Sequence, residues 1–476
     1  MQCQYPQHFD ILKWIVKARP QCRTPVRRLH QGTETIKKFY SKDLSTVYQT
    51  NNETGTASAV EDESAVVQTA HDPYRALRFR DFRLLLIGNF IAVIGEQMLT
   101  VAIGWELYDR TNSALALGGV GLAQVIPVIL FSLPAGHVAD RFNRKNIVVI
   151  STLVLLLASL VLALLSFTHG ALPLIYTCLA LIGTAEAFNN PASSTLEAQV
   201  VPEDAFENAT TWSSSSWQLA SVLGPGLGGF LIALTQGASW VYVANAGTML
   251  VFVILLLMLR TRGQKRLPAS EKATLRSLIE GLGFLRGNQI VLAAITLDLF
   301  AVLLGGATTL LPIYARDILQ VGPTGLGWLR AAPSVGAVCM ALLLAHRPPF
   351  KRGGRALLLA VAGFGLATII FGLSRSFWLS LLMLFALGAL DNISVVIRHT
   401  LLLLRTPDEM RGRISAVSSL FISASNQLGG FESGLAAQLF GPLISVVGGG
   451  VGTILVVIAV ALCWPEMRKL GTLRKS

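Results

Sequence analysis

Long apolar segments alternate with short polar ones along most of this sequence, from residue 84 onward. Each apolar segment is about 20 residues long, the length that an α-helix needs to cross roughly 30 Å of hydrocarbon. Twelve such segments follow one another, at residues 84–107, 114–135, 146–167, 171–189, 212–234, 238–259, 289–312, 326–345, 356–374, 377–398, 413–438 and 441–463. This pattern predicts an all-α membrane protein with twelve transmembrane helices.

The polar stretches divide the chain into parts. Residues 1–72 contain no apolar segment long enough to span a membrane, so we expect a disordered N-terminal extension, due either to an upstream start or to a regulatory element. Apolar side chains at positions 275, 278, 279, 282 and 285 would share one helical face. The predicted parts are a six-helix half at 73–260, a cytoplasmic linker with an amphipathic surface helix at 261–288, a second six-helix half at 289–463 and a basic cytoplasmic tail at 464–476.

Composition and charge support a membrane protein. Hydrophobic residues make up 52% of the chain and charged residues only 14%, which is typical of membrane proteins. The net charge of +12 gathers in every second loop, which by the positive-inside rule places both termini in the cytoplasm. This distribution argues against nucleic acid binding. The five cysteines are scattered, so neither a disulfide framework nor a metal site is predicted, and we expect no cofactor.

The two halves are similar to each other at an offset of 205 residues. This offset places Glu186 on Asp391, Gly224 on Gly429 and Gly229 on Gly434. Internal duplication of this kind is common among secondary transporters.

One charged segment and one glycine-rich segment resemble a known family. The segment between the second and third apolar runs, with Gly136, Asp140, Arg141, Arg144 and Lys145, resembles the signature of the major facilitator superfamily, although Asn143 replaces the usual glycine. The glycine-rich segment resembles the end of a motif found in that family's proton-coupled exporters; its residues are Gly224, Pro225, Gly228 and Gly229.

Other segments are similar to the enterobactin-exporter-like branch of the family, also described as transmembrane secretion effectors. These segments are 297–300, 329–333, 407–413 and 425–434. The resemblance implies two six-helix halves, with spans one, four, seven and ten around a central cavity.

Ionisable side chains occur within these four spans. A charged residue at a helix centre costs about 2.5–3.5 kcal/mol on insertion scales, so such residues usually have a function. We expect Glu96, Glu186, Asp298, Asp391 and Arg398 to form a substrate and proton pathway. Arg398 is a candidate to bind an anionic or catecholate-like group. The alternative is a static ion pair that joins the halves, between Arg398 and either Asp391 or Glu186.

Two further residues belong to the predicted pathway. Asn190 lies one helical turn from Glu186, and Glu432 lies in span eleven. Glu432 is either a second coupling acid or a partner in a hydrogen bond between helices. Glu106, near Trp105 and Tyr108, is expected at the membrane interface.

The charged and glycine-rich motifs suggest conformational roles. Gly136, Asp140, Arg141, Arg144 and Lys145 are predicted to form a switch, in which Asp140 contacts the start of span eleven near Arg413. The alternative is a plain cytoplasmic turn. The glycines of span five allow close helix packing, or else prevent leakage in an exporter.

The predicted function is export of a small organic molecule, a siderophore or similar secreted metabolite, by proton-coupled alternating access in a bacterial cytoplasmic membrane. Broad-specificity multidrug efflux is the alternative, and a non-transporting scaffold or receptor is a remote one. The expected partners are the substrate, protons and the lipid bilayer, and we expect a monomer. An enzyme is not predicted, because no phosphate-binding loop or zinc-protease motif occurs and neither His137 nor His399 has a nucleophile on its own helix.

Overall fold

A computed structural model describes residues 72–260, 283, 287–348, 350 and 352–471, and these form helices and turns only. Within them, the side chains of residues 133, 140, 408, 409, 411–413, 415–417, 419 and 420 are not described. The predicted N-terminal extension and nearly all of the predicted linker, including its surface helix, lie outside the described residues.

The first half begins with a short 3-10 helix, η1 (Ala76–Arg78), and another, η2 (Glu203–Ala205), precedes α7. Its long helices are α3 (Arg80–Thr111), α4 (Ala114–Arg141), α5 (Arg144–Phe167), α6 (Leu172–Val200), α7 (Phe206–Thr235) and α8 (Ser239–Leu257).

The second half begins with an interrupted helix: α10 (Gln289–Leu304), η3 (Ala307–Leu310), α11 (Leu311–Ile313) and the π-helical η4 (Tyr314–Ile318). The helices that follow are α12 (Gly322–Ala345), α13 (Gly353–Leu373), α14 (Phe377–Arg405), α15 (Asp408–Phe440), α16 (Pro442–Cys463) and α17 (Pro465–Lys469).

Eleven helices in the described residues are long and apolar enough to cross a membrane. The 33-residue α15, which corresponds to the predicted span at 413–438, is not one of them. The protein is therefore multi-pass, as predicted, and the count of twelve spans stays a prediction. Several helices continue past their apolar segments; α6, for example, was expected to end at 189 and ends at Val200. Hydropathy marks the part of a helix that can lie in lipid, whereas backbone hydrogen bonding continues into the polar end.

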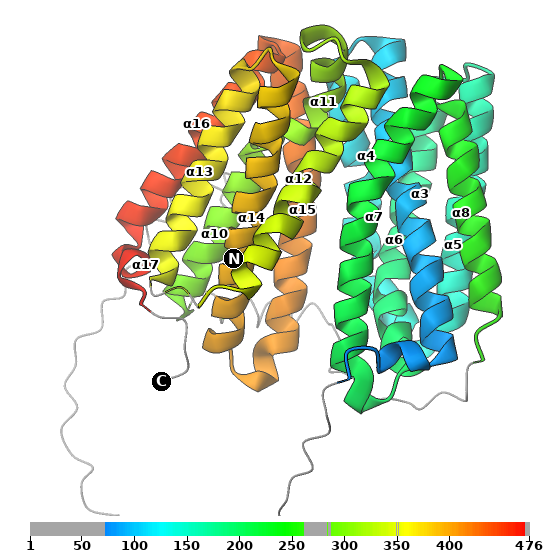
Figure 1. Cartoon of the computed structure of the whole chain (residues 1–476), viewed down its shortest axis with the longest axis horizontal. Helices are drawn as coiled ribbons and strands as arrows, with labels where there is room; N and C mark the ends of the chain where they lie inside the picture. The colour runs from blue at the N-terminus through cyan, green and yellow to red at the C-terminus, as the bar shows by residue number, and fades with distance from the viewer. Residues whose placement is uncertain (1–71, 261–282, 284–286, 349, 351, 472–476) are drawn as a thin grey trace, which may run out of the picture. The chain divides into compact units, whose positions relative to one another are not determined.

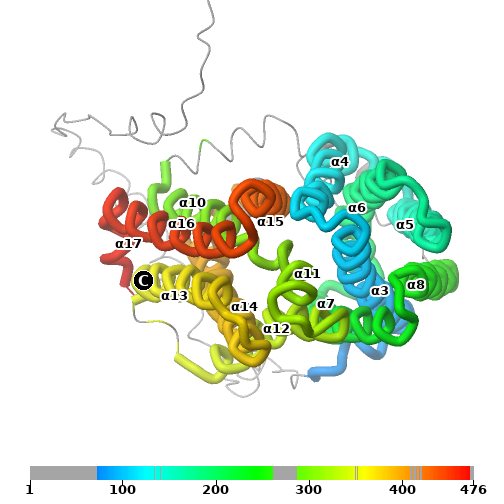
Figure 2. Tube along the Cα trace, turned by 90° about the horizontal axis from the view of Figure 1, so that it is seen from above, coloured from blue at the N-terminus to red at the C-terminus, as the bar shows by residue number. Residues whose placement is uncertain are grey.

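The helix bounds follow the internal repeat. The bounds of α6 and of α14 differ by 205 residues at both ends. Between the halves, α7 packs against α12, and α4 packs against α15 (Figure 2). A Cβ atom added at Gly229 would lie 2.9 Å from Cα of Gly327, and one added at Gly434 would lie 2.7 Å from Cα of Gly118. Glycine pairs thus bring the helices into contact at both of these seams.

The two ends of the helix bundle differ. At one end Asn112, in the left-handed conformation, connects α3 to α4; at the other, Phe142 and Asn143 connect α4 to α5. We call these the Asn112 end and the Asn143 end; the Asn112 end is at the top of Figure 1.

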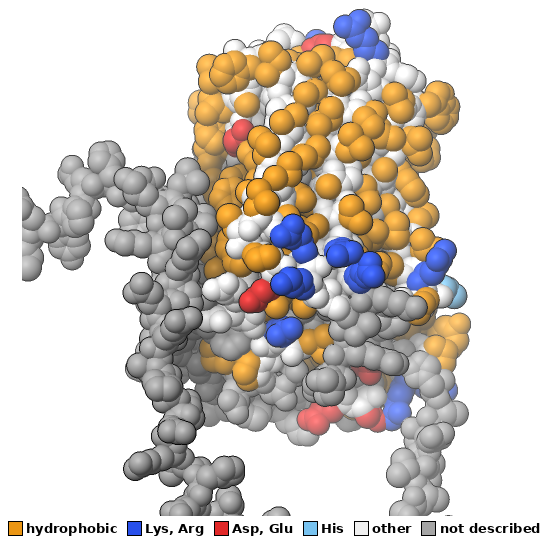
Figure 3. Space-filling view, turned by 90° about the vertical axis from the view of Figure 1, so that its left-hand side faces the viewer, with side chains coloured by type: hydrophobic (Ala, Val, Ile, Leu, Met, Phe, Trp, Pro, Cys, Tyr) orange, Lys and Arg blue, Asp and Glu red, His pale blue; other side chains and the backbone are white. Residues whose placement is uncertain are grey.

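A broad hydrophobic surface covers one side of the second half, and lysine and arginine side chains gather along its lower edge (Figure 3). Leu359 on α13 and Leu462 on α16 are 72% and 68% exposed. Arg352, Arg355 and Lys469 are exposed near the Asn143 end of the same helices. An apolar surface bounded by basic side chains is typical of a face in contact with lipid.

Candidate functional site

A polar cavity of about 300 Å³ lies between the two halves. The first half contributes residues of α3, α4, α5, α6 and α8, and the second half contributes residues of η3, α11, α12 and α15. The polar or charged side chains around it are Glu96, Gln97, Thr100, Gln124, Ser159, Glu186, Asn245, Thr309, Arg330, Asn426 and Gln427. This combination of apolar walls and convergent polar groups is typical of a ligand site.

Two of the predicted pathway residues, Glu96 and Glu186, line this cavity together. Glu96 lies on α3 and Glu186 on α6, close enough for their charges to interact. Among the described residues, no lysine, arginine or histidine lies within ion-pair distance of either carboxyl. A pair of carboxyl groups without a cationic partner can bind a proton or a cationic group between them.

Arg330 also lines the cavity, from α12 in the second half. Arg330 is not among the site residues predicted from the sequence. Its charge within the predicted span at 326–345 is costly and could have identified it. Its side chain is half-buried, and its only hydrogen bond in the described part of the chain is a long one of 3.5 Å from Nη1 to the carbonyl oxygen of Thr308.

Asp298 and Arg398 form an ion pair, with side chains 9% and 13% exposed. The predicted pairing of Arg398 with Asp391 or Glu186 is therefore wrong, and the pair does not join the halves, because α10 and α14 both belong to the second half. Asp298 and Arg398 line a separate, mostly apolar cavity of about 170 Å³ in that half, together with His399. Asp391 borders a small gap in the second half, and Asp298 lines the same gap.

The structure does not bring Asn190 and Glu432 into the central cavity. Asn190 is exposed on α6, one turn beyond Glu186. Glu432 is half-buried on α15 and accepts a hydrogen bond of 3.4 Å from Ser433. Two amides of the same helix, Asn426 and Gln427, line the cavity instead.

The predicted switch segment is more helical than its charge suggested. Residues 136–141 form the last turns of α4, and only Phe142 and Asn143 connect α4 to α5. The side chain of Asn143 accepts a hydrogen bond of 3.0 Å from the backbone N–H of Lys145 and so caps α5. Helix capping is thus a physical reason for asparagine here in place of the family's usual glycine.

The basic residues of this segment lie in different environments. Lys145 donates hydrogen bonds of 3.2 and 2.8 Å to the carbonyl oxygens of Leu257 and Leu259 at the end of α8, a favourable place for a cation. Arg144 is buried, and its Nε has no hydrogen-bond partner among the described residues. Arg141 is exposed. The side chains of Asp140 and Arg413 lie outside the described part, so their contact stays a prediction.

The glycine-rich segment of α7 packs closely against two helices. A Cβ atom added at Gly224 would lie 2.5 Å from Cβ of Gln97, and one added at Gly228 would lie 2.9 Å from Cα of Met98. Pro225 lies within α7 between them. These contacts with α3, together with the contact of Gly229 with α12, support the packing interpretation.

Polar side chains connect the halves at the Asn112 end. The hydroxyl of Tyr108, on α3, donates a hydrogen bond to the carboxylate of Asp317, on η4. Arg316 lies 3.2 Å from Asp109, donates a hydrogen bond of 3.2 Å to Oδ1 of Asn112 and lies 5.7 Å from the ring centre of Tyr108. We call these five residues the cross-half latch. Arg316 also donates a hydrogen bond of 3.4 Å to the backbone carbonyl oxygen of Tyr108. The remaining hydrogen bonds between the halves in the described part involve Gln438, beside the latch, and the contact of Gln427 with Gln124.

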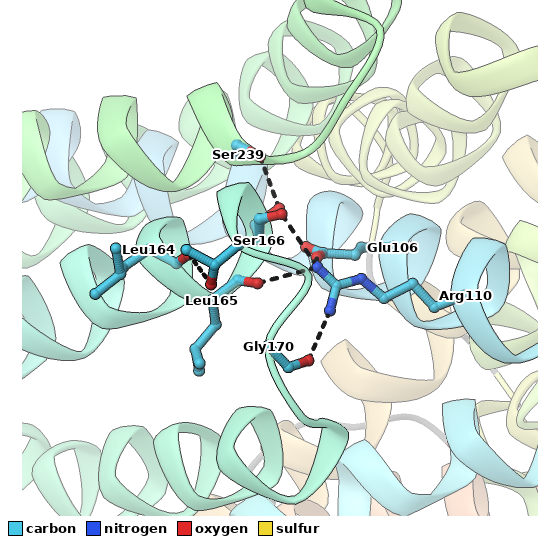
Figure 4. A network of polar contacts seen from close by, with 8 residues as sticks. Glu106, Arg110, Leu164, Leu165, Ser166, Gly170 and Ser239 are labelled. Atoms are coloured by element: carbon cyan, nitrogen blue, oxygen red, sulfur yellow. Dashed lines mark hydrogen bonds and ion pairs between the residues drawn. The ribbon is translucent and has the colours of Figure 1, made fainter.

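A buried ion pair supports the first half behind the latch (Figure 4). Arg110 lies 2.5 Å from Glu106 and donates hydrogen bonds of 3.1 to 3.2 Å to the carbonyl oxygens of Leu165, Ser166 and Gly170 at the end of α5. Glu106 is only 7% exposed, so its side chain is buried within the protein, and its expected position at the membrane interface stays a prediction. The hydrogen-bond partners are distant in sequence, and hydropathy does not reveal them.

A multi-pass helical bundle with two repeated halves and a polar cavity between them is typical of membrane transporters. The chain belongs to the Major Facilitator Superfamily, because the model of that family matches residues 85–430.

Two curated relatives are each 25% identical to this chain. One is the multidrug efflux pump Tap of Mycolicibacterium fortuitum, where the similarity covers 75% of this chain and 89% of Tap. The other is the enterobactin exporter EntS of Escherichia coli O1:K1, where it covers 82% of this chain and 92% of EntS.

Solved structures share the fold at lower identity. A bacterial homologue of the human lysosomal transporter Spinster, in an inward-facing and occupied conformation, has a TM-score of 0.62 at 17% identity, over 84% of this chain and 99% of that one. A mutant of the peptide transporter POT has a TM-score of 0.66 at 13% identity, over 84% of this chain and 100% of that one.

Proposed function

We propose that this protein exports a small organic molecule across a bacterial cytoplasmic membrane by proton-coupled alternating access. The observation that carries the proposal is the cavity between the halves, where Glu96 and Glu186 lie without a cationic partner among the described residues. An acid that is accessible from alternate sides in turn can carry a proton inward as the substrate leaves. Each charge that crosses 100 mV contributes about 2.3 kcal/mol.

The loop charges support cytoplasmic termini, which would place the Asn112 end outside the cell. The cross-half latch would then close the outer end. The expected contact between Asp140 and the start of α15 near Arg413 would form when the inner end closes. Asp298, Asp391 and Arg398 would act within the second half, and Glu432 at the margin of the pathway.

For the substrate we propose a siderophore or similar secreted metabolite. The name of the E. coli relative supports this class, as do the amide groups around the cavity, which match a ligand rich in oxygen atoms. Multidrug efflux is the second candidate. It is supported by the name of the mycobacterial relative and by the two cavity acids, which would suit a cationic drug.

The test is substrate flux in proteoliposomes under an imposed proton gradient, with a catecholate siderophore and the cationic dye ethidium as probes. We expect the gradient to drive siderophore movement, and Glu96→Gln or Glu186→Gln to lower the rate about a hundredfold or more, in the range of one general acid–base group. Glu466→Gln, which changes an exposed acid on α17, should retain the wild-type rate.

Movement of ethidium alone would favour multidrug efflux. Equal flux with and without the gradient, in the wild type and both variants, would overturn proton coupling.

A further inference from the structure

We infer that Arg330 is an oxyanion subsite of the central cavity, where it binds a carboxylate or phenolate-type oxygen of the transported molecule. This inference rests on the proposed function, and it narrows the substrate to molecules that carry such a group. From the sequence alone, Arg398 is the candidate for this role.

The contacts of the two arginines favour Arg330. Arg398 is paired with Asp298, so its charge is already neutralised within the second half. Arg330 has no acid within ion-pair distance in the described part of the chain, although Glu96 and Glu186 line the same cavity. A guanidinium group has five N–H donors, and a single long hydrogen bond to Thr308 uses one of them.

An unpaired guanidinium group away from bulk water is costly, and a bound oxyanion would offset that cost. The planar group binds a carboxylate through two parallel hydrogen bonds and cannot be deprotonated at physiological pH. Binding at Arg330 would therefore remain available whatever the protonation state of the acids.

The position of Arg330 gives the cavity a polarity. Among the described residues that line the cavity, Arg330 is the cationic one, and it belongs to the second half. Glu96 and Glu186 belong to the first half. Thr309 and Gln427, also of the second half, add hydrogen-bonding groups on the side of Arg330. A molecule with an oxyanion at one end and a donor or cationic group at the other would contact both halves at once.

A matched pair of dyes tests this subsite. Rhodamine 110 carries a free carboxylate, and rhodamine 123 is its methyl ester, so the two differ only in the group that Arg330 would bind. Equilibrium binding of each dye to the full chain in lipid nanodiscs would be measured by fluorescence polarisation for the wild type, Arg330→Gln and Arg330→Lys. Arg375→Gln, which changes an exposed arginine after α13, is the control.

We expect Arg330→Gln to weaken rhodamine 110 binding about ten- to hundredfold, the range of one charge-assisted hydrogen-bonded contact, and to change rhodamine 123 binding less than about threefold. Arg330→Lys should recover part of the loss. Unchanged binding of rhodamine 123 also shows that the variant is folded.

Equal weakening of both dyes, or no weakening of either, would overturn the subsite. Gradient-driven flux in the wild type separates this result from the proposed function. If the wild type transports the dyes but Arg330→Gln leaves their affinity ratio unchanged, only the subsite fails. If the wild type binds neither dye but moves the siderophore under the gradient, the subsite fails and the proposed function stands; if it moves neither the siderophore nor a dye, both fail.

Discussion

Arg110, Arg330 and Arg398 all lie within the helical bundle, and each meets a different requirement. Arg110 binds Glu106 and the carbonyl end of α5, and Arg398 binds Asp298. Arg330 faces the cavity with a single hydrogen bond in the described structure. Arg110 forms its contacts within the first half and Arg398 within the second, whereas Arg330 is free to bind a ligand.

The pair of Asp298 and Arg398 leads to a stability prediction. Asp298→Asn leaves Arg398 without its counterion, and breaking one partner of a buried pair costs about 3–5 kcal/mol. We expect a loss of that size in the free energy of unfolding, measured by chemical unfolding in mixed micelles.

The double variant Asp298→Asn/Arg398→Gln should recover most of that loss, since two neutral amides can hydrogen bond without an unpaired charge. If the double variant were as unstable as the sum of both single variants, the pair would have no role in stability.

At the scale of the helix, the two seams between the halves depend on glycine. A Cβ atom added at Gly229 would lie 2.4 Å from the carbonyl oxygen of Pro323, and one added at Gly434 would lie 2.8 Å from that of Ala114. We expect Gly229→Ala to push α7 away from α12, and Gly434→Ala to push α15 away from α4. Overpacking costs about 1–3 kcal/mol. A cost of this size changes the ratio of open to closed molecules at the Asn112 end at least about fivefold.

The measurement is the rate at which a membrane-impermeant thiol reagent, added at the Asn112 side, labels Thr309→Cys in a cysteine-free background. Thr309 lines the cavity, so labelling reports opening of that end. The matched control is Gly247→Ala, because a Cβ atom there meets nothing within 4 Å. An unchanged rate in both seam variants would show that the seams do not limit opening.

Much of the helical framework could be predicted from the sequence. Apolar length located the spans, because it depends on residues that are close together in the chain. The offset of 205 residues between the halves recurs in the bounds of α6 and α14. The switch segment was predicted as a charged loop, but hydropathy does not distinguish the polar end of a helix from a turn.

The site was predicted only in part, for a physical reason. Each cavity acid was visible as a charge within an apolar segment. The pairing of Asp298 with Arg398 was not visible, because these residues are 100 positions apart and meet only through the packing of α10 and α14. Arg330 lies in span eight, whereas the family resemblance implies a cavity lined by spans one, four, seven and ten, so Arg330 was not predicted as a site residue.

For the whole molecule, we expect the cross-half latch to set the balance between the states of the proposed transport cycle. Tyr108→Phe removes a partly buried hydrogen bond to a carboxylate, which contributes about 1.5–3 kcal/mol. Asp109→Asn removes a pair in which Asp109 is 56% exposed, and such pairs contribute about 0–1 kcal/mol. We therefore expect Tyr108→Phe to open the Asn112 end more than Asp109→Asn does.

Pulsed electron paramagnetic resonance between spin labels at Gln236→Cys and Arg375→Cys would measure the opening, because both residues are exposed at that end, one in each half. Tyr74→Phe, which changes an exposed tyrosine of the first half at the Asn143 end, is the control. Identical distance distributions for Tyr108→Phe and the control would remove the latch from the mechanism.

The π-helical turn at Tyr314–Ile318 gives this latch a second property. The N–H of Leu319 donates to the carbonyl oxygen of Tyr314, five residues earlier, with a distance of 2.7 Å. A return to α-helical register shifts the turn by one residue and rotates its side chains by about 100°. Arg316 and Asp317 would then point away from Asp109 and Tyr108, while one backbone hydrogen bond replaced another. Rewinding this single turn of helix would therefore release the contacts of Arg316 and Asp317 with the first half.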